Sequence, residues 1–222
     1  MIPLRDTIPS HTKPFVTQLL ILVNVLVFFH EIALEPYARN HFILEYGMTP
    51  ARLQLTDLIT SMFLHGGWMH LIGNMWFLWI YGDNVEDVFG HGKYLMFYLL
   101  CGIVAALAQF VISPMSRVPV IGASGAIAGV MGAYLVKFPS SRILTLVFVF
   151  FFVTTMEIPA FLILIYWFVL QVFSGVGSVG YSNLSQGGVA FFAHIGGFIA
   201  GAALVFLLGT KRRYSSRHDL NW

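Results

Sequence analysis

Long apolar runs separated by short polar breaks dominate the pattern of this chain. A helix needs about 20 predominantly apolar residues to cross a bilayer. The runs that approach this length are 15–34, 66–82, 94–112, 122–136, 160–173 with its flanks, and 189–208. Backbone polar groups in lipid must be satisfied within the segment, which favours helices. The pattern therefore predicts an all-α, polytopic membrane protein with a bundle of six transmembrane helices.

The stretches between these runs differ in character. Residues 1–14 are polar and contain three prolines, which predicts a short cytoplasmic tail. The long connection 36–64 has mixed polarity and is expected to lie partly in the membrane surface. Residues 82–87 form a short acidic link. The apolar part of 140–157 is too short to span comfortably, so we interpret it as an interfacial or re-entrant piece. Gly and Ser dominate 174–188, which predicts a flexible loop.

The basic residues predict the orientation in the membrane. Six spans place both termini on one side, and a cytoplasmic N-terminus leaves only Arg39, Arg52 and Arg117 of the twelve Lys and Arg residues outside. This agrees with the positive-inside rule and predicts N-in, C-in. No small-residue cleavage site follows the first run, so we expect an uncleaved anchor rather than a signal peptide. The expected parts are a tail at 1–14, a membrane domain at 15–209 and a basic cytoplasmic tail at 210–222.

Composition supports a membrane protein. Only 10% of the residues are charged and 58% are hydrophobic, with a mean hydropathy of +0.79, whereas a soluble domain carries about 25% charged residues. The single cysteine, Cys101, excludes an internal disulfide framework and a thiolate metal cluster. We expect no cofactor, no metal and no nucleic-acid partner.

One serine, Ser124, stands among glycines and alanines at the start of the fourth run. Serine is a weak nucleophile and needs a positioned base. The second, fourth and sixth runs all start from the outer face, so His70, Ser124 and His194 fall at similar depth. The odd-numbered runs contribute no polar group of this kind. The alternative is that Ser124 only packs, since small-residue membrane helices are common.

Two glycine stripes predict how His194 meets Ser124. The stripes consist of Gly125 and Gly129 in the fourth run and of Gly197 and Gly201 in the sixth. Residues four apart share a helix face, so facing stripes would bring the two backbones close. Imidazole could then take the hydroxyl proton and later give it to a leaving amine. No Asp or Glu is available at this depth, which favours a dyad over a triad. A purely structural histidine is the alternative.

His70 and Asn74 are also four apart and share a helix face. An imidazole N–H and an amide are suitable donors for an oxyanion, although an Asn that bridges helices is an open alternative. A zinc site is disfavoured because His65 and His70 are five apart and no H-E-x-x-H motif occurs. We expect His65 to hold the long first connection in place.

Three separated motifs carry a resemblance to a known family. They are His65…His70-x-x-x-Asn74, Gly122-x-Ser124-Gly125 and Ala193-His194-x-x-Gly197-x-x-x-Gly201. Together they resemble the rhomboid family of intramembrane serine proteases, over about residues 15–209. The resemblance implies a six-helix core, Ser124 as nucleophile, His194 as base, and His70 and Asn74 as oxyanion donors.

The resemblance further implies partners and location. The substrates would be single-pass transmembrane proteins, cleaved near the outer face of the lipid bilayer. Through the same resemblance, the compact six-span form implies a bacterial plasma (inner) membrane protein. Some members carry an aromatic residue four positions after the serine that packs on the catalytic histidine, and here it is Ala128. We therefore expect Phe191, Phe192 or a residue of the second run to hold His194.

Two other classes of membrane protein are alternatives to a protease. A non-catalytic rhomboid-like chaperone or adaptor would bind membrane helices, but such relatives usually lack the serine or the histidine. A small transporter or channel would show polar groups deep in several spans and inverted repeats. Apart from the cluster near the outer face, the apolar runs contain few polar groups and little sign of inverted repeats. The sequence therefore favours an intramembrane protease.

Overall fold

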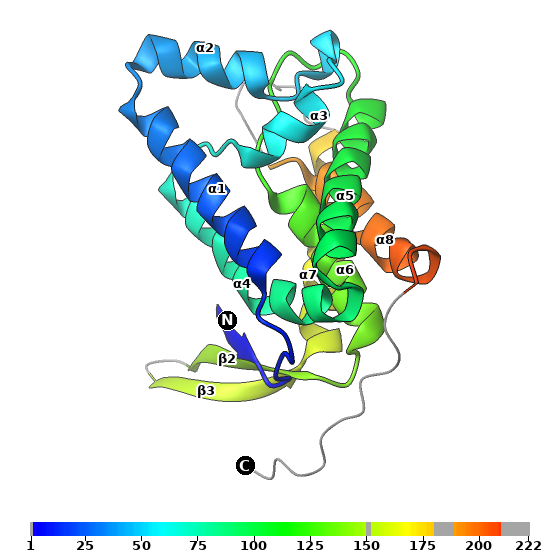
Figure 1. Cartoon of the computed structure of the whole chain (residues 1–222). Coiled ribbons are helices and arrows are strands. Elements are labelled where there is room, and N and C mark those ends of the chain that lie inside the picture. Colours follow the sequence, from blue (N-terminus) through cyan, green and yellow to red (C-terminus); the bar gives the residue numbers. More distant parts are fainter. Residues whose placement is uncertain (1, 150–151, 180–188, 210–222) are drawn as a thin grey trace.

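A computed structural model describes residues 2–149, 152–179 and 189–209, and most of them are helical (Figure 1). The α-helices are α1 (Phe15–Ala33), α2 (Pro36–Tyr46), α3 (Asp57–Thr60), α4 (Trp68–Phe89), α5 (His91–Ile112), α6 (Ser124–Lys137), α7 (Ala160–Val179) and α8 (Phe191–Leu207). Two 3-10 turns are η1 (Pro50–Arg52) and η2 (Ser61–Phe63). The strands are β1 (Ile2–Asp6), β2 (Arg142–Val149) and β3 (Phe152–Pro159).

Helix α6 lies at the centre of the bundle. All ten residues from 125 to 134 are buried. The helix contacts α4, α5, α7 and α8, and its Gly and Ala residues allow these neighbours to approach closely. Ser124, the first residue of α6, is half-buried and directly precedes this buried stretch.

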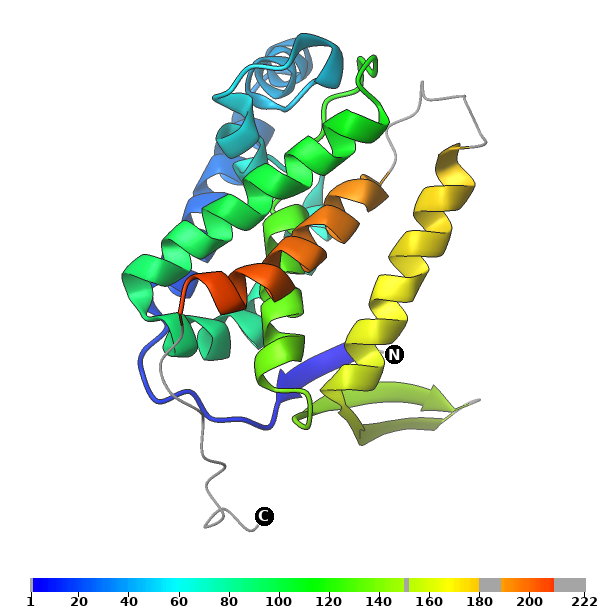
Figure 2. The ribbon, with the colours of Figure 1, turned by 90° about the vertical axis from the view of Figure 1, so that its right-hand side faces the viewer.

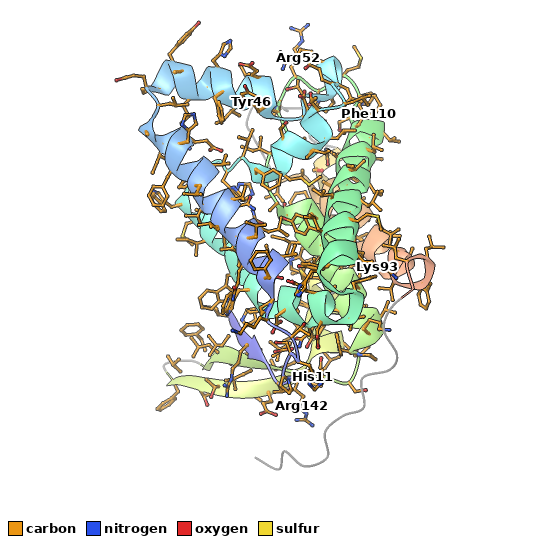
Figure 3. The ribbon with its side chains drawn as sticks, in the orientation of Figure 1. His11, Tyr46, Arg52, Lys93, Phe110 and Arg142 are labelled. Atoms are coloured by element: carbon orange, nitrogen blue, oxygen red, sulfur yellow. The ribbon has the colours of Figure 1, made fainter. Side chains whose placement is uncertain are left out.

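The helices fit a membrane protein. Helix α1, helix α5 and residues Ala160–Ser178 of α7 are long and apolar enough to cross a membrane, and α6 and α8 are shorter apolar helices. Arg52 lies at one end of the molecule and Arg142 at the other (Figure 3). The predicted helical membrane architecture is therefore confirmed, while the count of six spans stays a prediction.

A small antiparallel sheet lies at the end of the bundle opposite to α2 (Figure 1). Its order is β1-β2-β3, with Ile2 opposite Leu146 and Val149 opposite Phe152. The prediction of an all-α fold was therefore wrong in this part. The expected tail at 1–14 contains β1, and the segment 140–157, expected to be interfacial or re-entrant, contains β2 and most of β3, which pair antiparallel. Val, Ile, Thr and Phe favour extended backbone there, and β1 adds the third strand that an isolated hairpin needs for stability.

Two helices extend beyond their predicted ends. Residues 82–87, expected as an acidic link, continue α4. Residues 174–179 continue α7, so the loop predicted to start at Ser174 does not start there. The rest of that predicted loop, 180–188, and the predicted basic tail at 210–222 lie outside the described residues.

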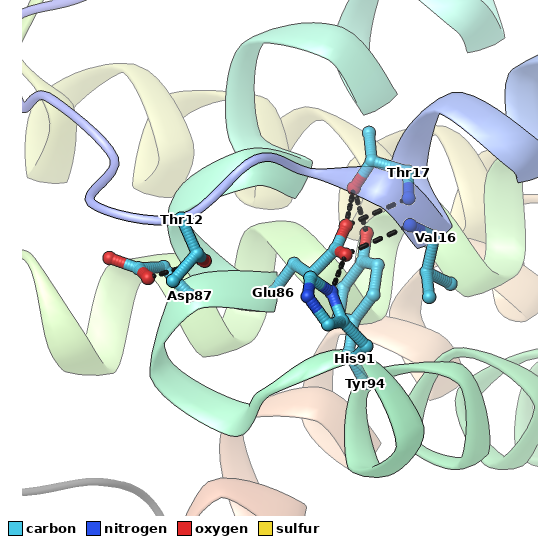
Figure 4. A network of polar contacts seen from close by, with 7 residues as sticks. All are labelled: Thr12, Val16, Thr17, Glu86, Asp87, His91 and Tyr94. Carbon is cyan, nitrogen blue, oxygen red and sulfur yellow. Dashed lines mark hydrogen bonds and ion pairs between the residues drawn. The ribbon is translucent and has the colours of Figure 1, made fainter.

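The acidic end of α4 is helical because its carboxylates find partners on the N-terminal segment (Figure 4). Glu86 is fully buried. Its Oε1 accepts the backbone N–H of Val16 at 2.9 Å, and its Oε2 accepts the backbone N–H and the hydroxyl of Thr17 at 2.8 and 2.7 Å. His91 Nδ1 lies 2.5 Å from Oε1. The residue at the N-cap of α1 is a proline with no side-chain cap, so Glu86 supplies the acceptor that the first turn of α1 lacks.

The connection between α1 and α4 folds over the end of the bundle at which α6 begins. Its backbone bonds Met48 to Val120 in an isolated β-bridge, and the N–H of Gly122 donates to the carbonyl of Ser61 at 2.9 Å. The segment before Ser124 is thus hydrogen-bonded to the long connection at two points, Val120 and Gly122. This attachment positions the start of α6.

Candidate active site

The structure brings Ser124 and His194 into hydrogen-bond contact. Ser124 is the first residue of α6, and His194 lies at the end of the first turn of α8. His194 Nε2 is 2.7 Å from Ser124 Oγ, and the histidine is only 9% exposed. A serine hydroxyl that donates to an imidazole nitrogen is the geometry required for general-base activation.

The glycine stripes allow this contact. A Cβ atom on Gly197 would collide with the carbonyl of Gly125, and one on Gly201 would collide with Gly129. Helices α6 and α8 therefore pack backbone against backbone over these residues. Their close approach places the N-terminal ends of both helices side by side, which is where the serine and the histidine lie.

His70 and Asn74 lie beside the turn that leads into Ser124. Gly122 has φ +118, and a Cβ atom built on it would lie 2.6 Å from His70 Nε2 and 3.6 Å from Asn74 Nδ2. Only glycine combines that backbone conformation with so little space. Gly122 therefore lets two polar side chains of α4 approach the backbone next to the serine.

His70 and Asn74 each present a hydrogen-bond donor beside Gly122. Gly66 donates its backbone N–H to His70 Nδ1 at 3.3 Å, so in the neutral ring the hydrogen is on Nε2. Asn74 Nδ2 is buried and has no hydrogen-bond partner within the described part of the chain. Buried donors are nearly always paired. An unpaired one beside a serine suits a negative charge that exists only during a reaction.

His65 lies behind His70, and its ring is completely buried. The two rings are 5.1 Å apart, and the backbone N–H of His65 donates to the Glu31 carboxylate at 3.1 Å. Burial, and then the nearby His70, lower the pKa of His65 to about 4, so its ring is neutral at physiological pH. Its backbone links the start of α4 to α1. Within the described ranges, no cluster of three or more His, Cys, Asp or Glu side chains is arranged to hold a metal ion.

Two contacts of His194, both from α7, were not predicted from the sequence. Gln171 Oε1 lies 2.8 Å from His194 Nδ1, and the ring of Trp167 lies 5.7 Å from the imidazole at an angle of 36°. The prediction that odd-numbered runs contribute no such polar group was therefore wrong. The ring found packing on His194 is that of Trp167 rather than Phe191, Phe192 or a residue of α4. A glutamine in an apolar membrane run was the available signal.

The fold and the site together define a helical membrane protein in which a serine and a histidine share a partly buried hydrogen bond beside the side chains of His70 and Asn74. A family model described as the Rhomboid domain matches residues 52–211. The chain is 32% identical over 204 residues to rhomboid protease GluP of Bacillus subtilis (strain 168), a match that covers 90% of this chain and 36% of GluP. It is 30% identical over 197 residues to rhomboid-like protein 11, chloroplastic, of Arabidopsis thaliana, covering 85% and 67%.

The putative rhomboid protease YdcA of Bacillus subtilis (strain 168) is 33% identical over 123 residues, covering 55% of this chain and 61% of YdcA. The chain belongs to the rhomboid family of intramembrane serine proteases. It is thus an integral membrane protein, and the resemblance inferred from the three motifs is confirmed. The chain spans about a third of the length of GluP and about two thirds of the plant relative.

Proposed function

We propose that this chain is a serine endopeptidase that hydrolyses peptide bonds of transmembrane substrates, with Ser124 and His194 as its catalytic dyad. The observation that carries the proposal is the 2.7 Å hydrogen bond between Ser124 Oγ and His194 Nε2. It joins two helices, and the two residues are 70 positions apart in the sequence. Family membership supports the same chemistry, since two of the bacterial relatives are named as rhomboid proteases.

In the proposed mechanism, Ser124 Oγ attacks the scissile carbonyl while His194 Nε2 accepts its proton. The imidazolium then protonates the leaving amine, and water hydrolyses the acyl-enzyme. The oxyanion accepts hydrogen bonds from His70 Nε2–H, from the free Asn74 amide and from the backbone N–H of Ser124 at the N-terminus of α6. The reaction uses no cofactor and no metal.

The membrane arrangement is part of the proposal. Six helices would span the bilayer: α1, α4, α5, α6, α7 and α8. The membrane domain is 15–209, flanked by 1–14 and 210–222, with both termini in the cytoplasm of a bacterium and the domain in its plasma membrane. Ser124 would then lie toward the outer face, where single-pass membrane proteins are cleaved.

Cleavage of a model single-pass substrate in liposomes tests the dyad. Wild type, Ser124→Ala and His194→Ala are purified and assayed in parallel. We expect cleavage by wild type and none by either variant, which also controls for a contaminating protease. Cleavage that survives Ser124→Ala would refute the mechanism. If no sample cleaves, a fluorophosphonate probe decides between the enzyme and an adaptor, because only an activated serine reacts with it.

A further inference from the structure

Gln171 is the second hydrogen-bond partner of His194. It lies on α7 four residues after Trp167, so both side chains lie on the same helix face. The amide oxygen can only accept a hydrogen bond, so the 2.8 Å contact places the imidazole hydrogen on Nδ1. The lone pair of Nε2 then points at Ser124 Oγ. One contact thus selects the tautomer in which His194 can act as a base.

We propose that Gln171 is a positioning residue that acts through His194. The inference rests on the proposed function and extends the dyad to three residues, Ser124, His194 and Gln171, joined by two hydrogen bonds. In serine hydrolases an acidic residue holds the catalytic imidazole in the required tautomer and stabilises the imidazolium. An amide does the first task fully and the second in part. It also avoids a charged side chain inside the membrane, which is expensive.

Helix α7 holds Gln171 in place although the helix lies at the edge of the bundle (Figure 2). Phe168 stacks on Phe198 of α8 with ring centroids 4.7 Å apart, and Trp167 packs against both Phe198 and His194. These ring contacts hold the turn of α7 just before Gln171 against α8. A functional side chain needs neighbours that fix its rotamer and position. The aromatic contacts of α7 supply them.

Three substitutions separate positioning from packing. Gln171→Leu removes the acceptor and keeps the approximate shape. Gln171→Glu keeps an acceptor oxygen and adds a negative charge. Gln109→Leu is the matched control, because Gln109 is a glutamine of the apolar helix α5 whose buried Oε1 has no hydrogen-bond partner in the described part of the chain. Each variant is assayed for kcat, KM and the rate of fluorophosphonate labelling from pH 5 to pH 9.

We expect Gln171→Leu to lower kcat and the labelling rate about 10- to 100-fold with little change in KM, since the lost bond is strongest when the imidazole becomes charged. Gln109→Leu should stay close to wild type. Gln171→Glu should retain activity at neutral and alkaline pH, while the acidic limb of its pH profile moves up by about one pH unit or more. Loss of packing alone would lower the activity without moving that limb. The proposal is refuted if the Gln171→Glu profile superimposes on wild type and Gln171→Leu matches Gln109→Leu.

The tautomer of His194 is read independently of turnover. In a sample with 15N-labelled histidine, the His194 signals are assigned by their loss in His194→Ala. Wild type and Ser124→Ala should both show hydrogen on Nδ1, and Gln171→Leu should show a mixture of tautomers. A mixture already present in wild type would refute the role of Gln171. If wild type neither cleaves nor reacts with the probe but has the Nδ1 tautomer lost in Gln171→Leu, the proposed function fails while the positioning contact stands.

Discussion

Glu86→Gln tests whether the carboxylate between α4 and α1 stabilises the fold. The amide retains one carbonyl oxygen, which can serve either the donors of Thr17 or the N–H of Val16, but not both. Its NH₂ group then faces a backbone N–H at the start of α1. An unsatisfied buried donor costs about 1–3 kcal/mol, and bonds to a charged acceptor are stronger than neutral ones. We therefore expect the free energy of unfolding to fall by about 2–4 kcal/mol.

The assay is equilibrium unfolding in mixed detergent micelles, followed by helix content. Glu157→Gln is the matched control, because this half-exposed glutamate of β3 forms a 4.0 Å ion pair with Arg142 at the protein surface. Exposed pairs contribute little, so its change should stay within about 0.5 kcal/mol of wild type. If Glu86→Gln is as stable as Glu157→Gln, the first turn of α1 does not depend on Glu86 and the reasoning fails.

Two further predictions concern the oxyanion donors and the pH dependence of stability. Asn74→Ala should lower kcat about 10²- to 10³-fold with little change in KM, because its free amide would bind only the developing charge. Steady-state cleavage kinetics test this. A kcat near that of wild type would exclude Asn74 as an oxyanion donor. Asp6 accepts a hydrogen bond from the Tyr134 hydroxyl at 2.8 Å, and burial raises the pKa of its carboxyl to about 7 despite that bond. The folded state thus keeps a proton that the unfolded chain releases near pH 4, so stability falls as pH rises from about 4 to 7. At pH 4 Asp6→Asn should be nearly as stable as wild type, and at pH 8 its free energy of unfolding should be higher by on the order of 2 kcal/mol. Unfolding curves at both pH values test this. The same stability difference between variant and wild type at both pH values would refute it.

Much of the helical scaffold could be predicted because its signals are local. An apolar run long enough for a bilayer predicts a helix wherever it occurs, and α1 and α5 begin and end close to the predicted residues. The contact between Ser124 and His194 was predictable as well. Parallel runs place the two residues at one depth, and the glycine spacing indicates which helix faces meet.

The ends of helices were less predictable, because distant residues decide them. The acidic residues at 83–87 suggested a link exposed to water, but Glu86 is buried and its charge is matched by donors from α1. The apolar run in 142–149 is compatible with a helix or a strand. Pairing with β1, more than 130 residues earlier in the sequence, favours the strand. Neither outcome follows from the residues within the segment.

By itself, the sequence determined the class of protein and the residues that its motifs share with the rhomboid family. Apolar periodicity, glycine spacing and each of the serine and histidine motifs lie within one short segment of the chain, so they can be recognised without the fold. Only the tertiary structure decided what orients His194. Gln171 is a single polar residue on a helix whose rotation and register the sequence leaves open. Packing of Trp167 and Phe168 against α8 sets that rotation and brings the amide oxygen within 2.8 Å of the imidazole. A hydrogen bond between helices depends on their relative placement, which no single segment encodes.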